Sequence, residues 1–186
     1  MTSTLSIARW PNRVEALVEE IGDPLAHARV MSSCASTQDQ ARAMGLGAVV
    51  VTGQQTAGRG QRGNVWFGGG DAGLAFSVVL PETNRPERSR AVASAIVVAL
   101  GDLVPRRLRV KAPNDVLLDG RKLAGVLIEQ ADGLAVIGVG INVGAMDWPD
   151  ALEGQAVSLH DAGVEIERIV VLELVLPLLV EAWSSS

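Results

Sequence analysis

The sequence predicts an α+β fold, in which one mixed, mostly antiparallel sheet is packed by helices. Helical segments alternate with short apolar strands along the chain, and no internal repeat of about 20–50 residues is present. Two Asp-Gly pairs, Asp119-Gly120 and Asp132-Gly133, separate apolar runs and favour the tight turns of antiparallel hairpins. The length of 186 residues and the 48% hydrophobic content fit one domain with a substantial core.

The first half of the chain is expected to form two helices and three strands. In order, these are a helix over 11–21, a strand over 27–32, a helix over 37–45, and strands over 48–52 and 74–80. Pro11 suits the first turn of a helix, and Gly22 ends that helix. Ser36 or Thr37 is expected to supply a hydroxyl cap for the second helix. The valine run over 48–52 is typical of a buried strand.

The second half is expected to form two helices and four strands. In order, these are a helix over 88–103, strands over 108–111, 116–118, 122–130 and 134–143, and a helix over 165–183. The first of these helices is rich in Ala and Val with almost no polar side, so it should be well buried. The two Asp-Gly turns join the last three strands into an antiparallel meander. Pro177 should kink the final helix.

An irregular loop is expected from Gly53 to Gly70, because these 18 residues show no apolar period. Loops of this length inside a compact domain are uncommon, and they are usually functional or disordered. Half of the 20 glycines lie between Gly45 and Gly73. The loop is therefore the first candidate for a functional segment.

The charge is unevenly distributed. The formal net charge is −5, yet residues 59–122 hold 11 Lys or Arg against 6 Asp or Glu. A basic, glycine-rich middle in an acidic protein suggests a site for a small anion, and a solvated basic face is the alternative. The net acidity argues against a general nucleic-acid binder, so no DNA partner is expected.

Other classes of protein are excluded by single residues and short segments. One cysteine, Cys34, excludes a disulfide framework and is interpreted as a small apolar filler. His27 and His160 are isolated from any acid-rich metal spacing. The N-terminus lacks the pattern of a signal peptide, and the most apolar stretch, 169–180, is too short to span a bilayer. The expected location is cytoplasmic, with no membrane partner.

The stretch Gly58-Arg-Gly-Gln-Arg-Gly63 has the letters of the dinucleotide fingerprint G-x-G-x-x-G. That fingerprint requires a helix directly afterwards, whereas a strand follows here, so a nicotinamide site is rejected. The glycines still allow backbone N–H groups to converge on an anion, and Arg59 and Arg62 add positive charge. A surface loop without function is the alternative.

Two further stretches carry candidate side chains. In Lys111-Ala-Pro-Asn-Asp115, the lysine can reach a carboxylate or phosphate, while Asn114 and Asp115 can hydrogen-bond or bind Mg²⁺. The same residues are also ordinary turn chemistry. Gly125 lies inside a strand, which often marks the close approach of a ligand or another backbone. Asn142 lies among apolar residues and needs a specific partner, either a ligand or a core network.

Together these stretches resemble the catalytic domain of biotin protein ligases, within the biotin/lipoate ligase superfamily. The resemblance runs in order from Ser36 to about Leu159. The stretches that carry it are Ser36-Thr37-Gln38, Gln55-Thr-Ala-Gly-Arg-Gly-Gln-Arg-Gly63 with Trp66, Lys111-Ala-Pro-Asn-Asp115, Lys122-Leu-Ala-Gly-Val-Leu-Ile-Glu129, and Gly138-Val-Gly-Ile-Asn142-Val. Its fold would be the core shared with class II aminoacyl-tRNA synthetases.

The resemblance implies a two-step reaction with biotin, ATP and Mg²⁺. Biotin is first activated to biotinyl-5′-AMP and is then transferred to a lysine of the biotin carboxyl carrier protein of acetyl-CoA carboxylase, or of a similar carrier. Lys111 and Arg59 are the catalytic residues it implies, and Asp115 is the metal ligand. The implied biotin-binding residues are Ser36, Thr37, Gln38, Gln55, Arg59, Gly60, Gln61, Lys111 and Gly125. The implied ATP or adenylate-binding residues are Gly58, Arg59, Gly60, Gln61, Arg62, Gly63, Trp66, Asn114 and Asn142.

Three residues depart from the family pattern. Gln61 replaces an Arg of the loop, Gln38 replaces an Asn, and Ala112 replaces a Trp. The loss of a charge at Gln61 implies a reaction intermediate that is held less tightly.

The expected organisation is a single catalytic domain over 1–186, with 1–26 as an N-terminal helical extension, without a winged-helix module and without a C-terminal SH3-like barrel. Relatives pair through sheet edges, which leaves room for a homodimer. Two other functions stay open: a lipoate or octanoyl ligase or transferase on the same fold, and a non-catalytic biotin-binding relative.

Overall fold

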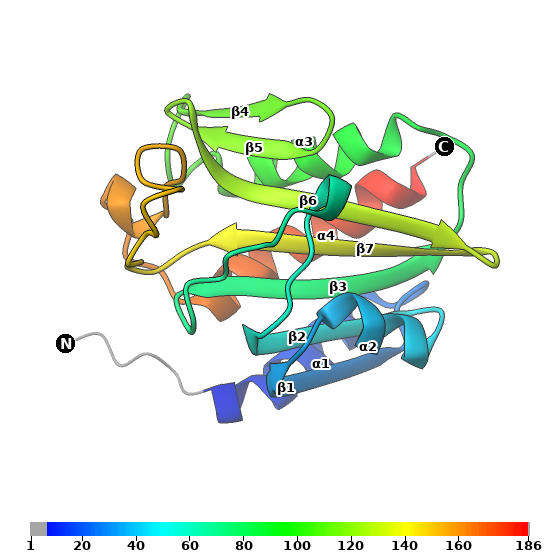
Figure 1. Cartoon of the computed structure of the whole chain (residues 1–186). Helices are drawn as coiled ribbons and strands as arrows, with labels where there is room; N and C mark the ends of the chain where they lie inside the picture. Colours follow the sequence, from blue (N-terminus) through cyan, green and yellow to red (C-terminus); the bar gives the residue numbers. More distant parts are fainter. Residues whose placement is uncertain (1–6, 186) are drawn as a thin grey trace.

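The computed structural model describes residues 7–185, and a seven-stranded mixed sheet forms its centre (Figure 1). The strands are β1 (His27–Cys34), β2 (Ala48–Gln55), β3 (Gly73–Pro81), β4 (Leu108–Lys111), β5 (Asp115–Leu118), β6 (Arg121–Ala131) and β7 (Leu134–Asn142). Their order across the sheet is β1-β2-β3-β7-β6-β5-β4. Only β1 and β2 pair in parallel, and the other neighbours are antiparallel. The predicted fold class is confirmed.

Four α-helices pack on the sheet. They are α1 (Trp10–Ile21), α2 (Thr37–Met44), α3 (Arg88–Leu100) and α4 (Arg168–Ser184), and short 3₁₀ turns lie at Ile7–Arg9, Gln61–Gly63 and His160–Ala162. Helices α1, α3 and α4 cover one face, while α2 lies on the other face together with the segment that joins β2 to β3 (Figure 1). The sheet therefore has a helix-covered face and a more open face.

The main core lies between the sheet and α1, α3 and α4. Phe76 of β3, Ile96 of α3 and Leu176 of α4 are fully buried there, and Trp10 brings α1 into the same cluster. A smaller cluster under α2 contains Val50 and its neighbours from the opposite face of the sheet. This division follows from the alternation of side chains along a strand, which sends successive valines of β2 to opposite faces.

The predicted meander of β5, β6 and β7 is confirmed. Asp119 has a φ of 49° and Asp132 a φ of 56°, and a glycine with positive φ follows each. This pair of left-handed residues is what a tight type I′ turn requires. The hairpins bring the single glycine of β6 next to those of β7, with Gly125 opposite Gly140.

Some predicted boundaries are wrong. Strand β2 continues to Gln55 instead of ending at Thr52, because β1 continues beside it and pairs Cys34 with Gln55. The connecting segment is therefore shorter at its start than expected and spans 56–72; it also contains a 3₁₀ turn and a bridge between Arg59 and Val65, so it is not wholly irregular.

Two helix boundaries also differ from the prediction. Helix α3 ends at Leu100 rather than 103, where Gly101 follows. Helix α4 begins at Arg168 rather than at 165, and it continues through Pro177 without a break in the helix assignment. Within the described residues, no helix combines the length and the apolar character that a membrane span requires.

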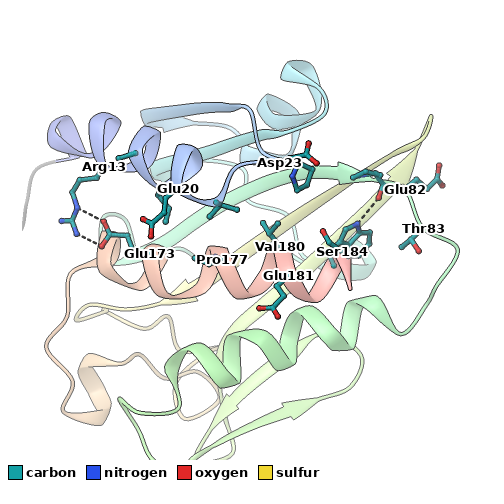
Figure 2. Close-up of a pocket in the computed structure, with 16 residues that line it drawn as sticks. Arg13, Glu20, Asp23, Glu82, Thr83, Glu173, Pro177, Val180, Glu181 and Ser184 are labelled. Atoms are coloured by element: carbon teal, nitrogen blue, oxygen red, sulfur yellow. Dashed lines mark hydrogen bonds and ion pairs between the residues drawn. The ribbon is translucent and has the colours of Figure 1, made fainter. Parts of the chain in front are cut away.

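A large cavity, about 1080 Å³, lies on the helix-covered face between α1 and α4 (Figure 2). Carboxylates of Glu20, Asp23 and Glu181 line it, and an ion pair of Arg13 with Glu173, 2.6 Å between Nη2 and Oε2, joins the two helices at one end. None of the residues that the sequence singled out for binding or catalysis lines this groove. The candidate site is on the opposite face of the sheet.

Candidate functional site

The candidate site contains a small pocket on the more open face of the sheet, which we term the inner pocket. Its walls come from the start of α2, the end of β2, the 56–72 segment, Asn114 just before β5, and the strands β6 and β7. The lining residues are Ser36, Thr37, Gln38, Gln55, Arg59, Gly60, Gln61, Trp66, Asn114, Lys122, Gly125, Val126, Leu127, Gly138, Val139 and Gly140. The structure thus brings together nearly all the side chains that the sequence proposed for biotin, with Lys111 as the exception.

Glycines form the floor of the inner pocket. A Cβ at Gly138 would lie 2.9 Å from Cδ of Gln38, and one at Gly140 would overlap the indole ring of Trp66. Any larger residue would therefore fill the space above the strands. Gly125, the glycine inside β6, was predicted to mark a close approach. A Cβ at this position would lie 3.3 Å from the Trp66 ring.

Gln55 connects the end of β2 to the start of α2. Its Oε1 accepts hydrogen bonds from the backbone N–H of Thr37 at 2.8 Å and from the Thr37 hydroxyl at 3.1 Å. The predicted hydroxyl cap is wrong, since neither Ser36 nor Thr37 caps the helix through its side chain. Gln55 accepts the hydrogen bond from the first-turn N–H of Thr37 instead, so the Ser36 hydroxyl does not cap the helix.

Three buried polar atoms that belong to the inner pocket have no hydrogen-bond partner within residues 7–185. They are Oγ of Ser36, Oε1 of Gln38 and Nε1 of Trp66. A buried polar atom is costly unless it is hydrogen-bonded, and orphaned atoms are rare in folded proteins. A ligand with both donors and acceptors would satisfy them.

The Gln38 side chain is oriented by its amide nitrogen. This nitrogen donates to the carbonyl oxygen of Leu127 and to Oε2 of Glu129, both at 3.3 Å. The side chain reaches across the floor over Gly138. It therefore sets the depth of this end of the pocket.

Arg59 is held by two carboxylates. Its guanidinium makes a bidentate pair with Asp39 of α2, with both distances at 2.8 Å, and approaches Oε2 of Glu129 on β6 at 3.4 Å. The hydrogen bond from Arg59 lowers the pKa of Asp39, and the same bond raises the pKa of Arg59. These contacts fasten the 56–72 segment to α2 and β6, beside the inner pocket.

The other predicted anion-binding residues of the segment are divided between two surfaces. Gly60 and Gln61 line both the inner pocket and a shallow cavity on the outer side of the segment, whereas Gly58, Arg62 and Gly63 line only that shallow cavity. Arg62 is exposed and has a φ of 58°. The segment thus presents one side to the pocket and its most exposed cation to solvent.

A second space, the outer cavity, adjoins the inner pocket and measures about 390 Å³. The lining residues are Val65, Trp66, Phe67, Lys111, Asp115, Leu117, Gly120, Lys122, Asn142, Trp148, Leu152, Gly154, Gln155 and Ala156. Trp66 and Lys122 line both spaces. The inner pocket retains only about 40 Å³ around the indole ring, room for no more than a few water molecules.

Lys122 lies at the boundary between the two spaces. Its Nζ is 2.7 Å from Oδ1 of Asp115 and 5.8 Å from the centroid of the Trp66 ring. Lys111 lines the outer cavity alone and is exposed. Lys122 lies in one of the stretches that resemble the family, but nothing in the sequence pointed to it separately. Its position depends on how β5 and β6 align, and a register shift at Val116/Leu117 sets that alignment.

Two asparagines hold the strands beside the site. Nδ2 of Asn114 donates to the carbonyl oxygen of Val126 at 2.6 Å. Nδ2 of Asn142 donates to the carbonyl oxygens of Lys122 and Val157 at 3.2 and 3.1 Å. The amide nitrogens therefore belong to a core network, one of the two explanations open for Asn142, while contact of either residue with an adenylate stays a prediction.

The site offers little to a resident metal ion. Asp115 already pairs with Lys122, and the described part of the chain has no group of three or more His, Cys, Asp or Glu that could hold a metal. Mg²⁺ in nucleotide sites commonly takes one or two carboxylates together with substrate phosphates and water. The donor set therefore fits an ion that arrives with a nucleotide rather than a protein cage.

Cys34 ends β1 and is buried. Burial raises the pKa of its thiol, which keeps it protonated. This agrees with its interpretation as an apolar filler.

Comparison with known proteins places these features in one family. The model of the biotin/lipoate A/B protein ligase family matches residues 29–145. The chain is 33% identical over 172 residues to the bifunctional ligase/repressor BirA of Bacillus subtilis, covering 85% of this chain and 53% of that protein. It is 36% identical over 126 residues to the biotin–[acetyl-CoA-carboxylase] ligase of Mycobacterium tuberculosis, covering 63% and 47%. The chain thus spans about half the length of these relatives.

A solved structure shares the fold. The biotin protein ligase from Aquifex aeolicus, in complex with biotin and ATP, superimposes with a TM-score of 0.78 at 27% identity, covering 86% of this chain and 71% of that one. The family match covers the glycine floor, the 56–72 segment and both lysines of the outer cavity. The chain belongs to the biotin/lipoate A/B protein ligase family.

Proposed function

We propose that this protein is an ATP-dependent biotin protein ligase. The observation that carries the proposal is the inner pocket, whose glycine floor and unpaired polar atoms of Ser36, Gln38 and Trp66 suit a flat ring with hydrogen-bonding groups. The ureido ring of biotin has two N–H donors and a carbonyl acceptor. Relatives named as biotin ligases support the same substrate.

The same pocket argues against lipoate. The dithiolane ring of lipoate carries neither donors nor a carbonyl, so it would leave the buried polar atoms without partners. We therefore favour biotin over a lipoate or octanoyl substrate. A thermal-shift comparison of the two acids checks this, with stabilisation expected for biotin and not for lipoate.

The first chemical step joins two anions. A carboxylate oxygen of biotin attacks the α-phosphorus of ATP, the bond to the β-phosphate oxygen breaks, and pyrophosphate leaves. Positive charge at the boundary of the two binding spaces offsets the repulsion between the carboxylate and the phosphate. Lys122 lines both spaces, and we propose it for this role instead of Lys111, which is left at the rim of the outer cavity.

In the second step a lysine amine of a carrier domain attacks the carbonyl carbon of biotinyl-5′-AMP and AMP leaves. The nucleophile lies on the partner, so this chain has to bind and expose the anhydride without supplying a nucleophile. We propose the biotin carboxyl carrier protein of acetyl-CoA carboxylase, or a similar carrier, as the acceptor, which a relative's name supports. ATP would bring Mg²⁺ with it, and a cytoplasmic location would supply all three substrates.

We also propose one catalytic domain for residues 1–186, with 1–26 as its N-terminal extension. Trp10 of α1 is 2% exposed within the main core, which supports packing of the extension as part of the same domain. Formation of a homodimer stays a prediction.

Pyrophosphate release with biotin and ATP tests the activity, followed by transfer of radiolabelled biotin to a carrier domain. Release and transfer are expected. Biotin binding without release would support a non-catalytic biotin-binding protein instead and would overturn the ligase proposal.

The lysine assignment is tested with Lys122→Met and, as a matched control, Lys111→Met. Loss of a cation aimed at the transition state is worth about 100-fold or more in rate. We expect that loss in pyrophosphate release for Lys122→Met and a much smaller one for Lys111→Met. The reverse order would return the role to Lys111.

A further inference from the structure

Arg168 is a buried cation at the first position of α4, on the side of the sheet opposite the candidate site. Its residue exposure is 8%, and the ion pairs of the described residues do not include it. Its guanidinium carbon lies 5.0 Å from the centroid of the Trp10 ring. Burial of a charged group is costly, so the position calls for a specific reason.

The hydrogen bonds of Arg168 supply that reason. Its Nη1 donates to the carbonyl oxygen of Gly53 and to that of Gly73, both at 3.0 Å. Gly53 lies near the end of β2 and Gly73 begins β3, so the two carbonyls flank the 56–72 segment. One guanidinium nitrogen therefore joins both stems of the segment that carries Arg59 and Trp66.

Arg168 links the two stems at a place where β2 and β3 are no longer paired. Pairing of β2 with β3 runs only as far as Thr52 opposite Ala75, and it stops before Gly53. The backbone at both stems is also tightly packed: a Cβ at Gly53 would lie 2.7 Å from the carbonyl oxygen of Ser32, and one at Gly73 would overlap the carbonyl of Gly68. The hydrogen bonds from Arg168 thus join β2 and β3 at the point where the pairing between these two strands ends.

A carboxylate of the 56–72 segment also acts on the charge of Arg168. Burial lowers the pKa of Arg168, and the carboxylate of Asp71, which belongs to the segment, acts against this. Asp71 and Arg168 line one cavity of about 350 Å³ behind the stems. The segment therefore carries a carboxylate on the same side of the stems as the Arg168 cation.

We propose that Arg168 is a positioning residue for biotin activation, which clamps the two stems so that the segment carrying Arg59 and Trp66 stays beside the inner pocket. The proposal rests on the proposed ligase function. The side-chain hydrogen bonds of Arg168 go to the backbone of Gly53 and Gly73, neither of which lines the inner pocket, so Arg168 acts through these two stems.

The test compares Arg168→Met with Arg168→Lys and with a matched control, Arg88→Met. Arg88 also donates from its guanidinium to two backbone carbonyls, those of Ala182 and Ser185, but it does so at the far end of α4. The first readout is the rate of trypsin cleavage after Arg62, without substrates, at a temperature where circular dichroism shows every variant folded. The second is the biotin KM and kcat for pyrophosphate release.

Cleavage after Arg62 is expected to be about tenfold faster in Arg168→Met, the order expected for lost hydrogen bonds from a charged donor. The biotin KM should rise by a similar factor with a smaller change in kcat. Arg168→Lys should recover most of both, and Arg88→Met should match the wild type in both even if its melting temperature falls. Equal cleavage rates and KM values in Arg168→Met and Arg88→Met would overturn the clamp. If the wild type releases no pyrophosphate, the ligase function fails, while the cleavage rates still decide whether Arg168 holds the segment.

Discussion

Trp66 and Lys122 define the site at the scale of single residues, because they form the boundary between its two spaces. The indole ring occupies the floor over Gly140, and the ammonium group lies beside it, paired with Asp115. A ring-shaped ligand can enter the inner pocket only if the indole moves, since about 40 Å³ remains there. Movement of Trp66 would also change the surroundings of the Lys122 charge.

Gln61 is the residue at which weak retention of the intermediate is expected. It lines both the inner pocket and the outer side of the 56–72 segment, at a position where the resemblance to biotin protein ligases implies an arginine. A neutral side chain gives the anionic adenylate one favourable contact fewer. We expect the wild type to biotinylate bystander proteins detectably and Gln61→Arg to reduce this labelling.

The measurement is streptavidin detection of bystander proteins mixed with enzyme, biotin and ATP. Val98→Arg is the matched control, because it adds the same charge at a position on α3 that is 69% exposed and lines neither binding space. Labelling should fall in Gln61→Arg and not in Val98→Arg. Equal labelling by all three proteins would contradict the prediction.

At the scale of the element, the 56–72 segment is fastened at its tip and at its base. Arg59 fixes the tip to α2 and β6, and Arg168 fixes the base to α4. The two fastenings also differ in chemistry, since ion pairs with carboxylates hold the tip and hydrogen bonds to backbone carbonyls hold the base.

Asp39 should titrate below its ordinary pKa because of Arg59. The hydrogen bond from Arg59 lowers the pKa of Asp39 from an ordinary 3.8. A lowered pKa in the folded state means that the pair stabilises the segment above pH 3.8, and that this stabilisation is lost as the pH falls through the lowered value. The fastening at the tip is therefore expected to be constant from about pH 6 to 9.

A ¹³C carboxyl NMR titration measures the effect. Arg59→Gln should raise the pKa of Asp39 toward its ordinary value, while Arg42→Gln should change it less, because the charge of Arg42 has a weaker influence on Asp39 than Arg59 has. An unchanged Asp39 pKa in Arg59→Gln would show that the ion pair does not persist in solution.

In the molecule as a whole, the sheet lies between the residues of the main core and those of the candidate site. The main core lies on one face with α1, α3 and α4, and the inner pocket lies on the other. Phe76 of β3 points into that core and is 0% exposed. A substitution in the main core can therefore change the free energy of unfolding without replacing a residue that lines the inner pocket.

Phe76→Ala should lower the free energy of unfolding by about 3–5 kcal/mol, because it removes a buried ring and leaves a cavity. Val98→Ala is the control, since Val98 on α3 is 69% exposed and should change stability by less than about 0.5 kcal/mol. Urea denaturation followed by circular dichroism measures both. Similar values for the two variants would mean that Phe76 is not in a closely packed core.

The local pattern determined which elements form. The Asp-Gly turns predicted the hairpins because few residue pairs accept two left-handed conformations in succession, and the valine run in β2 predicted a buried strand. The same reasoning failed at Gln55, where pairing with β1 extends the strand, and at Ser36, where a distant glutamine caps α2. Both failures involve partners that are far away in the sequence.

Turn chemistry and periodicity, which are local properties of the chain, were enough to predict the fold class and the hairpins, and the ordered motifs led through the family resemblance to part of the inner-pocket lining. Folding was needed to show that Lys122 rather than Lys111 lines both spaces, that Arg59 is paired with Asp39 and Glu129, and that Arg168 joins the stems of the segment. Each of these depends on strand register or on contacts between distant elements. No local pattern specifies such contacts, because they are fixed by packing across the whole sheet.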